Sequence, residues 1–291
     1  MISEEFIKVG GHRIHYRTGG SPARGTLLGL HGGPGGSYDY LYPLFDLASD
    51  QTRVVLFDQS GGGKSDVPKD RSMFTVEHFV EEVEGVRKLL DLGKVHLYGH
   101  SWGGMLAQAY AIKHQTKLRS LILSGTCSSI PMLESEMELV FQGLSPKARK
   151  AITEHEALGE FEAPEYISAV DEFNSRHQVL VNPWPETLKF VFEHFGKAVG
   201  ETMFGPYLVK VTGNMKYWDV TEQLKSLRIP TLIICGEQDF LTPKLHKIIH
   251  AKIKGSKLVI LSGASHASMW ERREAYNGAI REFLDSLSNQ N

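Results

Sequence analysis

Residues Val95–Gly104, with the sequence VHLYGHSWGG, decide the fold of this chain. They begin as an apolar run typical of a buried β-strand, pass through Gly-x-Ser-x-Gly, and are followed by a run compatible with a helix. A strand, a tight turn around a serine and a helix describe a nucleophile elbow, whose flanking residues must be small. Gly99 and Gly103 satisfy this requirement. We therefore predict that the elbow presents the hydroxyl of Ser101 beside the free N–H groups of a helix N-terminus; a Gly/Ser surface turn is the alternative interpretation.

The composition is that of an ordinary soluble globular protein. Of the 291 residues, 41% are hydrophobic and 23% are charged, and the formal net charge is −2. A chain of this charge lacks the basic field that attracts nucleic acid, and no apolar run is long enough to cross a bilayer. The acidic start, Met1–Glu5, is unlike a secretory or transit peptide, so we expect a cytoplasmic protein, either a monomer or a small homo-oligomer. Cys127 and Cys235 adjoin predicted buried strands, which favours two reduced thiols, and no metal or cofactor site is indicated.

Strand-like and helix-like segments alternate along the first half of the chain and again near its end. Short apolar runs typical of buried strands are Thr26–Leu30, Arg53–Phe57, residues 95–100, Leu118–Leu123, Thr231–Cys235 and Lys257–Leu261. Glu5–Val9 and His12–Arg17 alternate apolar and polar residues around two glycines, which predicts a β-hairpin. Amphipathic helices are expected from Thr75 to Leu90 and from Trp270 to Leu287, and Tyr38–Phe45 is compatible with a helix. This order predicts an α/β fold with a mostly parallel sheet and helices on both faces.

The alternation stops between Ser128 and Val220. This stretch contains helical patterns and many aromatic residues, but no comparable apolar strand. We therefore predict that residues 1–127 and 221–291 form a catalytic domain, and that residues 128–220 are inserted as a helical lid over the strand ends.

A serine hydroxyl needs a base to become a nucleophile, and the base needs a partner that fixes its tautomer. In an open α/β sheet, such groups lie just past the C-terminal ends of the strands. Among the 13 histidines, His266 meets this test because it follows the last predicted strand across a short, flexible loop. Asp239 follows the preceding strand and is the predicted acid, with Glu237 as a weaker rival. The chain order Ser101, Asp239, His266 is that of the α/β-hydrolase triad.

Four other histidines near these motifs are expected to have other roles. His100 is adjacent to the serine in sequence but is expected to point elsewhere on a sharp turn. His246 and His250 fall on a predicted helix and are expected to face solvent. His31 ends a strand, but the glycine-rich loop that it begins has a different role.

The oxyanion of a tetrahedral intermediate requires two N–H donors. One is expected to be the backbone N–H of Trp102, directly after the nucleophile. The other is expected to be that of Gly33 in the loop 31–36, where glycines let the backbone approach a substrate; a plain glycine-rich turn is the alternative. Gly61–Ser65 is too compact for a phosphate-binding loop, so we interpret it as a structural turn beside the pocket.

Together these motifs resemble those of the proline iminopeptidase family, a group of α/β-hydrolase aminopeptidases that includes the archaeal tricorn-interacting aminopeptidase. The similarity extends from about Phe6 to Leu284 and is carried by HGGPG (31–35), DQSGGGKS (58–65), GHSWGG (99–104), TGNMKYWD (212–219), GEQD (236–239) and SHASMWE (265–271). The resemblance implies an α/β-hydrolase fold with Ser101 as nucleophile, Asp239 and His266 as its relay, and Gly33 and Trp102 as oxyanion donors.

The chain departs from this family where the free amino terminus of a substrate would be held. Members similar to the tricorn-interacting enzyme use two glutamates, one directly after the triad aspartate and one in the lid. Here Phe240 and Gly205–Leu208 stand at those places. A buried ammonium without a counter-charge costs several kcal/mol, so recognition of a free amine requires another acid. The acids considered, each otherwise interpreted as a solvated residue of a lid helix, are Glu134, Glu136, Glu138 and Glu201.

The sequence thus predicts a cofactor-free serine hydrolase that forms an acyl-enzyme at Ser101. We expect it to remove N-terminal residues, proline included, from short peptides, amino-acid amides or arylamides. The alternative is an esterase or amidase for small apolar acyl groups that needs no free amine, which Phe240 and the aromatic lid favour. A haloalkane dehalogenase or an epoxide hydrolase would need an aspartate at position 101. A binding protein on this fold is a further alternative, against which an intact triad argues.

Overall fold

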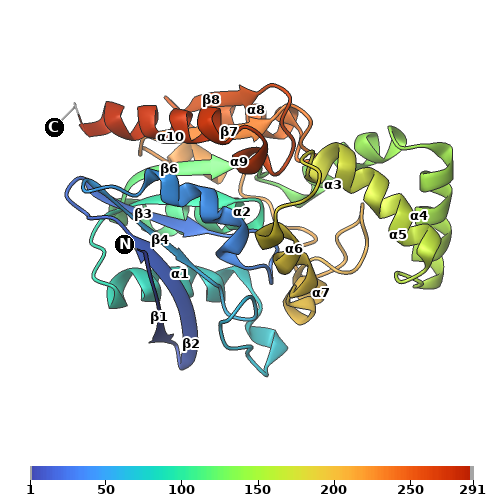
Figure 1. Cartoon of the computed structure of the whole chain (residues 1–291), viewed down its shortest axis with the longest axis horizontal. Helices are drawn as coiled ribbons and strands as arrows, with labels where there is room; N and C mark the ends of the chain where they lie inside the picture. Colours follow the sequence, from blue (N-terminus) through green and yellow to red (C-terminus); the bar gives the residue numbers. More distant parts are fainter. Residues whose placement is uncertain (1, 289–291) are drawn as a thin grey trace.

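Eight strands form one twisted sheet at the centre of the molecule (Figure 1). The computed structural model describes residues 2–288. The strands are β1 (Ile2–Val9), β2 (His12–Gly19), β3 (Gly25–Leu30), β4 (Thr52–Phe57), β5 (Val95–His100), β6 (Leu118–Ser124), β7 (Thr231–Gly236) and β8 (Lys257–Leu261). Their spatial order is β1-β2-β4-β3-β5-β6-β7-β8; β2 is antiparallel to both neighbours, and β3 to β8 are mutually parallel. The predicted hairpin and the mostly parallel sheet are therefore confirmed.

Helices cover both faces of the sheet because alternate side chains of each buried strand point to opposite sides. The elements around the sheet are η1 (Tyr38–Leu47), η2 (Arg71–Met73), α1 (Val76–Leu89), α2 (Trp102–His114), η3 (Gln115–Lys117), η5 (Gln223–Ser226), α8 (Pro243–Lys252), α9 (Ser268–Glu271) and α10 (Arg273–Ser288). Leu28 and Leu30 pack in one core with α1, α2 and α8, whereas Leu27 packs in a second core with η1 and α10.

Two helical predictions are confirmed, and a third needs correction. The segment that begins at Tyr38 is a 3-10 helix, with Pro43 inside it. The C-terminal helix is divided at Arg272 into α9 and α10. The helix expected after Thr75 is present as α1, and the Thr75 side chain caps it by accepting a hydrogen bond from the backbone N–H of His78 at 3.2 Å.

Five helices lie between β6 and β7, inside the stretch predicted to be a lid. They are α3 (Ile130–Gln142), α4 (Pro146–Leu158), α5 (Pro164–Phe173), α6 (Glu186–Glu193) and α7 (Lys197–Met203), with a π-helical turn η4 (Asn174–Gln178). The two ends of this stretch are joined, because Val220 N–H donates to the carbonyl of Ser128 and Ser129 forms a bridge with Asp219. Figure 1 shows α4 and α5 projecting well beyond the sheet.

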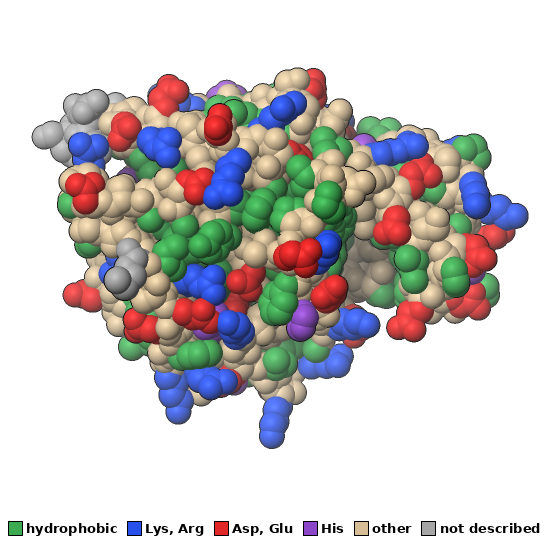
Figure 2. All heavy atoms as spheres, viewed as in Figure 1, with side chains coloured by type: hydrophobic (Ala, Val, Ile, Leu, Met, Phe, Trp, Pro, Cys, Tyr) green, Lys and Arg blue, Asp and Glu red, His purple; other side chains and the backbone are tan. Residues whose placement is uncertain are grey.

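The distribution of surface charge and the state of the two cysteines are as the composition leads one to expect. Figure 2 shows acidic and basic side chains intermixed over the visible face. Cys127 and Cys235 are both buried and unpaired, as predicted. Among residues 2–288, no helix combines the length and the apolarity that a bilayer crossing requires.

Candidate active site

The predicted elbow is present between β5 and α2. Ser101 has a backbone φ of +58°, a conformation that residues with side chains rarely adopt. Its neighbours have to be glycines: a Cβ on Gly99 would lie 2.1 Å from the carbonyl oxygen of Gly103, and one on Gly103 would lie 2.2 Å from that of Leu30. The Ser101 N–H donates to the carbonyl of Ser124 at 3.0 Å, which fixes the turn to β6. The elbow is thus held by close backbone packing on both sides.

His266 and Asp239 meet in the loops that follow β8 and β7. Asp239 Oδ1 lies 2.9 Å from His266 Nδ1 and accepts a second hydrogen bond, at 2.8 Å, from the N–H of Leu241. Both side chains are almost fully buried. Burial raises the pKa of Asp239 to about 7 and lowers the pKa of His266 to about 3. The imidazole is therefore uncharged at neutral pH, as a general base must be.

The third predicted member, Ser101, shares a cavity with His266. This cavity has a volume of about 200 Å³, and its remaining lining residues are Gly32, Gly33, Gly36, Tyr40, His100, Gln178, Leu188, Val191, Phe192, Phe195 and Phe240. Within residues 2–288, the Ser101 hydroxyl and His266 make no hydrogen bond with each other. Such contacts are often long in a free enzyme and shorten when substrate binds.

The two predicted oxyanion donors are positioned by the same packing. Trp102 begins α2, so its N–H is one of the helix amides without an intrahelical partner. Gly33 lines the cavity with a φ of +125°, and a Cβ there would lie 2.7 Å from the N–H nitrogen of Gly36. In the part of the chain that the structure describes, neither amide donates to another group. The indole Nε1 of Trp102 donates a hydrogen bond to Oε1 of Gln59 at 2.7 Å, which fixes the orientation of the ring.

His100 does not point away from the site, contrary to the sequence prediction. Its ring lines the cavity and packs against His266, with 4.4 Å between the ring centroids. Its Nε2 lies 3.0 Å from the carbonyl of His266, and its Nδ1 lies 2.8 Å from the hydroxyl of Tyr40, which accepts from the N–H of Gly32 at 2.6 Å. Burial holds the pKa of His100 well below its usual value, so the neutral ring donates through Nε2 and accepts at Nδ1. One chain of hydrogen bonds therefore connects the glycine-rich loop 31–36 to the backbone of His266.

His246 is buried, so the prediction that it faces solvent is wrong; His250 is exposed, as predicted. The ring of His246 donates through Nδ1 to the carbonyl of Thr242 and accepts the N–H of Thr126 at Nε2, 2.9 Å away. The hydroxyl of Thr126 in turn donates to the carbonyl of Ser101 at 2.8 Å. Sequence reasoning missed this support because only the fold brings α8 against the loop after β6.

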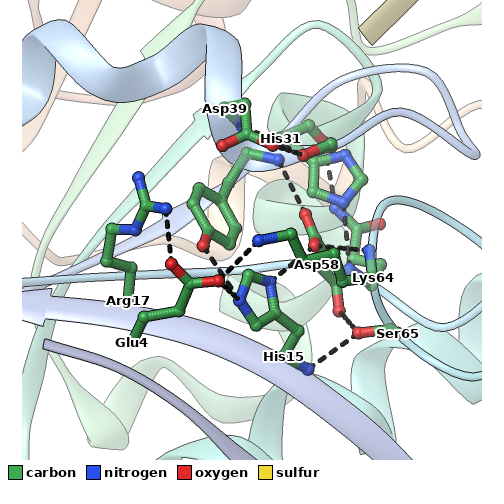
Figure 3. A network of polar contacts seen from close by, with 11 residues as sticks. Glu4, His15, Arg17, His31, Asp39, Asp58, Lys64 and Ser65 are labelled. Carbon is green, nitrogen blue, oxygen red and sulfur yellow. Dashed lines mark hydrogen bonds and ion pairs between the residues drawn. The ribbon is translucent and has the colours of Figure 1, made fainter. Parts of the chain in front are cut away.

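The rival acid and the glycine-rich turn have structural roles. Glu237 is exposed and accepts from the hydroxyl of Ser262 at 2.9 Å. The turn Gly61–Ser65 wraps around Asp58, which accepts the N–H of Lys64 at 2.9 Å through its side chain and the hydroxyl of Ser65 at 2.6 Å through its carbonyl (Figure 3). In residues 2–288, no group of three or more His, Cys, Asp or Glu side chains is arranged to hold a metal ion.

Comparison with known proteins identifies the family of this chain. The family model of the alpha/beta hydrolase fold matches residues 25–157. A proline iminopeptidase of Saccharolobus solfataricus is 43% identical over 295 residues, which cover 100% of this chain and 94% of the relative. A second, from Thermoplasma volcanium, is 38% identical and covers 96% of each chain. The chain belongs to the proline iminopeptidase family. The resemblance inferred from the motifs is confirmed.

Two solved structures match this chain over almost its whole length. The proline iminopeptidase of Mycobacterium smegmatis matches with a TM-score of 0.91 at 28% identity and covers 98% of both chains. VinJ matches with a TM-score of 0.93, also at 28% identity, covering 98% of this chain and 99% of its own.

Within this proline iminopeptidase fold, the acids considered for amine recognition have other partners. Glu134 accepts from the N–H of Val211, Glu138 from the side chain of Gln142, and Glu201 lies 4.0 Å from Arg71. Glu136 accepts from the hydroxyl of Thr242 and from Lys244. None of the four lines the cavity that Ser101 shares with His266. Glu201 instead lines a larger, more open cavity of about 930 Å³ on the other side of Gly33 and Phe195.

Proposed function

We propose that this protein is a serine hydrolase that acts through an acyl-enzyme on Ser101. His266 Nε2 takes the proton of the Ser101 hydroxyl as Oγ bonds to the substrate carbonyl, and Asp239 holds the imidazole in the required tautomer. The N–H groups of Gly33 and Trp102 stabilise the oxyanion. His266 then gives the proton to the leaving amine, the amide bond breaks, and a water activated by the same base releases the acyl group. The observation that carries this proposal is the shared cavity of Ser101 and of the His266–Asp239 pair.

The proposed substrates are short peptides, amino-acid amides or arylamides, from which the enzyme removes an N-terminal residue, proline included. Relatives of 43% and 38% identity are named proline iminopeptidase, which supports this reaction. A cavity of about 200 Å³, bounded by α6 and Phe240, suits one small residue on the acyl side. The adjoining cavity of about 930 Å³ suits the leaving peptide.

The division into a catalytic domain, residues 1–127 and 221–291, and a lid, residues 128–220, belongs to this proposal. The hydrogen bond between Val220 and Ser128 supports it, because it closes the inserted stretch at its base. A cytoplasmic location is proposed as well, supported by the unpaired thiols of Cys127 and Cys235.

An esterase or amidase that acts on small apolar acyl groups is the second candidate. The observation that favours it is the lining of the cavity, which includes Phe240 and Phe195 and contains no carboxylate. A protonated amine held there would lack a counter-charge, which costs several kcal/mol.

A substrate panel tests the two candidates. It compares proline and alanine p-nitroanilides, each with a free and with an acetylated amine, beside short-chain p-nitrophenyl esters, on the parent and on Ser101→Ala. The aminopeptidase is supported if the free-amine anilides have the highest kcat/KM. Faster turnover of acetylated anilides or esters supports the second candidate. Equal reaction of parent and variant with a fluorophosphonate probe would contradict both.

A further inference from the structure

We propose that the cavity beside Ser101 accepts an N-terminal ring without charge, so that the enzyme also removes N-terminal 5-oxoproline (pyroglutamate) from peptides and arylamides. The ring of 5-oxoproline has the size of the proline ring, but its nitrogen belongs to a neutral lactam. The reaction is the acyl transfer already described: Ser101 Oγ bonds to the carbonyl of the first residue, the bond to the next residue breaks, and water releases the acid. The inference thus rests on the proposed function and names a further substrate class for it.

The lining of the cavity carries no formal charge. Its apolar part consists of glycines and of leucine, valine and phenylalanine side chains, and it includes no Asp, Glu, Lys or Arg. The two carboxylates that act on His266 are already engaged. Asp239 lies behind His266 and accepts from it, and Glu271 accepts from the backbone N–H of Leu180 and from the hydroxyl of Ser265.

The titratable groups that face the cavity also stay neutral. They come from three elements: Tyr40 from η1, His100 from β5 and His266 from the loop before α9. Burial raises the pKa of the Tyr40 hydroxyl and lowers the pKa of both imidazoles. The residues contributed by α6, Leu188, Val191 and Phe192, have no titratable group. These three side chains therefore leave the lining uncharged near neutral pH, and the titrating Asp239 lies behind His266, outside the lining.

An amine enters such a site more readily after it has lost its proton. Burying an ammonium without a partner is strongly unfavourable, whereas an N-terminal amine with a pKa of about 8 is neutral in about one molecule in ten at pH 7. Binding the neutral form therefore lowers the apparent kcat/KM only about tenfold at that pH. A lactam avoids this loss, because it carries no proton to remove.

The cavity has the size and one polar group that a lactam needs. Its volume of about 200 Å³ exceeds the ~150 Å³ of an apolar cavity that takes up benzene. Gln178 lines it, and in the described part of the chain its side-chain amide makes no hydrogen bond. An amide offers both a donor and an acceptor, which match the N–H and the C=O of a lactam.

The test compares L-pyroglutamyl and L-prolyl p-nitroanilide on the full-length enzyme between pH 5.5 and 8.5, with Ser101→Ala as the blank. We expect both to be cleaved, with kcat/KM values within about tenfold of each other at pH 7. The ratio of prolyl to pyroglutamyl kcat/KM should rise about tenfold per pH unit up to about pH 8, because titration of the enzyme cancels in it.

The possible failures are distinguishable. Cleavage of the prolyl but not of the pyroglutamyl anilide overturns the inference and leaves the proposed function standing. If neither anilide is cleaved, or if Ser101→Ala matches the parent, the proposed function itself fails.

A matched pair of variants tests the charge of the lining directly. The ring of Phe240 packs on His266, with 4.4 Å between centroids, and lines the cavity. Phe240→Glu places a carboxylate there, while Phe240→Gln has nearly the same shape without charge. Relative to Phe240→Gln, we expect Phe240→Glu to raise the prolyl-to-pyroglutamyl ratio at pH 6 at least tenfold and to flatten its pH dependence. Equal ratios in the two variants would contradict the inference.

Discussion

Residues 2–288 contain two buried His–Asp pairs of the same length, and one of these two has its histidine at the cavity that Ser101 lines. His266 Nδ1 is 2.9 Å from Asp239, and His15 Nδ1 is 2.9 Å from Asp58. A serine accompanies the second pair too, since Ser65 accepts the backbone N–H of His15 at 2.9 Å. The two regions therefore offer similar residues in different surroundings.

The difference lies at the second ring nitrogen. Nε2 of His15 is 2.7 Å from Glu4, which also binds Arg17 and Lys64, so the ring is enclosed by charged partners (Figure 3). The ring of His266 instead faces the cavity that Ser101 lines. A His–Asp pair thus becomes a candidate base only where the second ring nitrogen of the histidine faces space for a substrate. In the His15–Asp58 pair, Glu4 occupies that nitrogen, and the pair joins β2 to the turn after β4.

The largest expected difference between the two His–Asp regions is in the effect of replacing the serine beside each pair. We expect Ser101→Ala to lower kcat/KM by about 10⁴-fold or more with little change in stability, because the acyl-enzyme cannot form. Ser65→Ala should leave kcat/KM close to that of the parent but lower the free energy of unfolding by about 1–3 kcal/mol, since it removes two buried hydrogen bonds. Kinetics and urea denaturation of both variants check this; a loss of activity of similar size in the two would contradict the assignment.

Replacing each aspartate by asparagine is the next test. Asp239→Asn should reduce kcat by about 10⁴-fold, because the amide favours the wrong tautomer of His266. Asp58→Asn breaks a buried pair that also holds the N–H groups of Tyr38 and Lys64, so it should cost about 3 kcal/mol of stability instead. Thermal unfolding and initial rates, measured on both proteins, distinguish the two outcomes. The comparison fails if Asp239→Asn remains active and Asp58→Asn does not.

The pH profile of kcat/KM should carry the signature of the buried Asp239. Its pKa is raised to about 7, so the carboxyl gains a proton as the pH falls through this value and no longer accepts from His266. For a substrate without a titrating amine, we expect kcat/KM to decline about tenfold per pH unit below about pH 7 and to reach a plateau above it. An acid limb that begins only below pH 5 would show that Asp239 stays ionised and is better solvated than its burial implies.

Local sequence signals predicted most of the fold and the five candidate site residues. Each signal lies within a few residues of what it describes: the glycines around Ser101, the apolar strands, and the loops that place Asp239 and His266 past strand ends. The solvent-facing assignment of His246 failed because its environment depends on α8 packing against the loop that contains Thr126, 120 residues away. Contacts of such separation leave no trace in a local pattern.

His100 is the instructive case, because its position was evident from the sequence but its direction was not. Its Nδ1 forms a hydrogen bond with the hydroxyl of Tyr40, 60 residues away in sequence, and that hydroxyl accepts the backbone N–H of Gly32. Tyr40→Phe removes that hydroxyl and leaves both groups without a partner. We expect a decrease of about 10- to 100-fold in kcat through displacement of the oxyanion loop, together with a loss of about 1–3 kcal/mol in stability.

Tyr38→Phe is the matched control for Tyr40→Phe, the variant with the smallest expected effect on activity. The hydroxyl of Tyr38 lies 3.4 Å from His15 Nε2, at the limit of a hydrogen bond, within the enclosed pair. Its removal should cost less than about 1 kcal/mol and leave kcat unchanged. If Tyr40→Phe affects stability alone, as a tyrosine in a purely structural network would, then the chain from Gly32 through Tyr40 and His100 to His266 supports the fold and does not position the catalytic groups. If kcat instead falls at unchanged KM in Tyr40→Phe but not in Tyr38→Phe, then Tyr40 helps to position the catalytic groups, whereas Tyr38 supports only the fold.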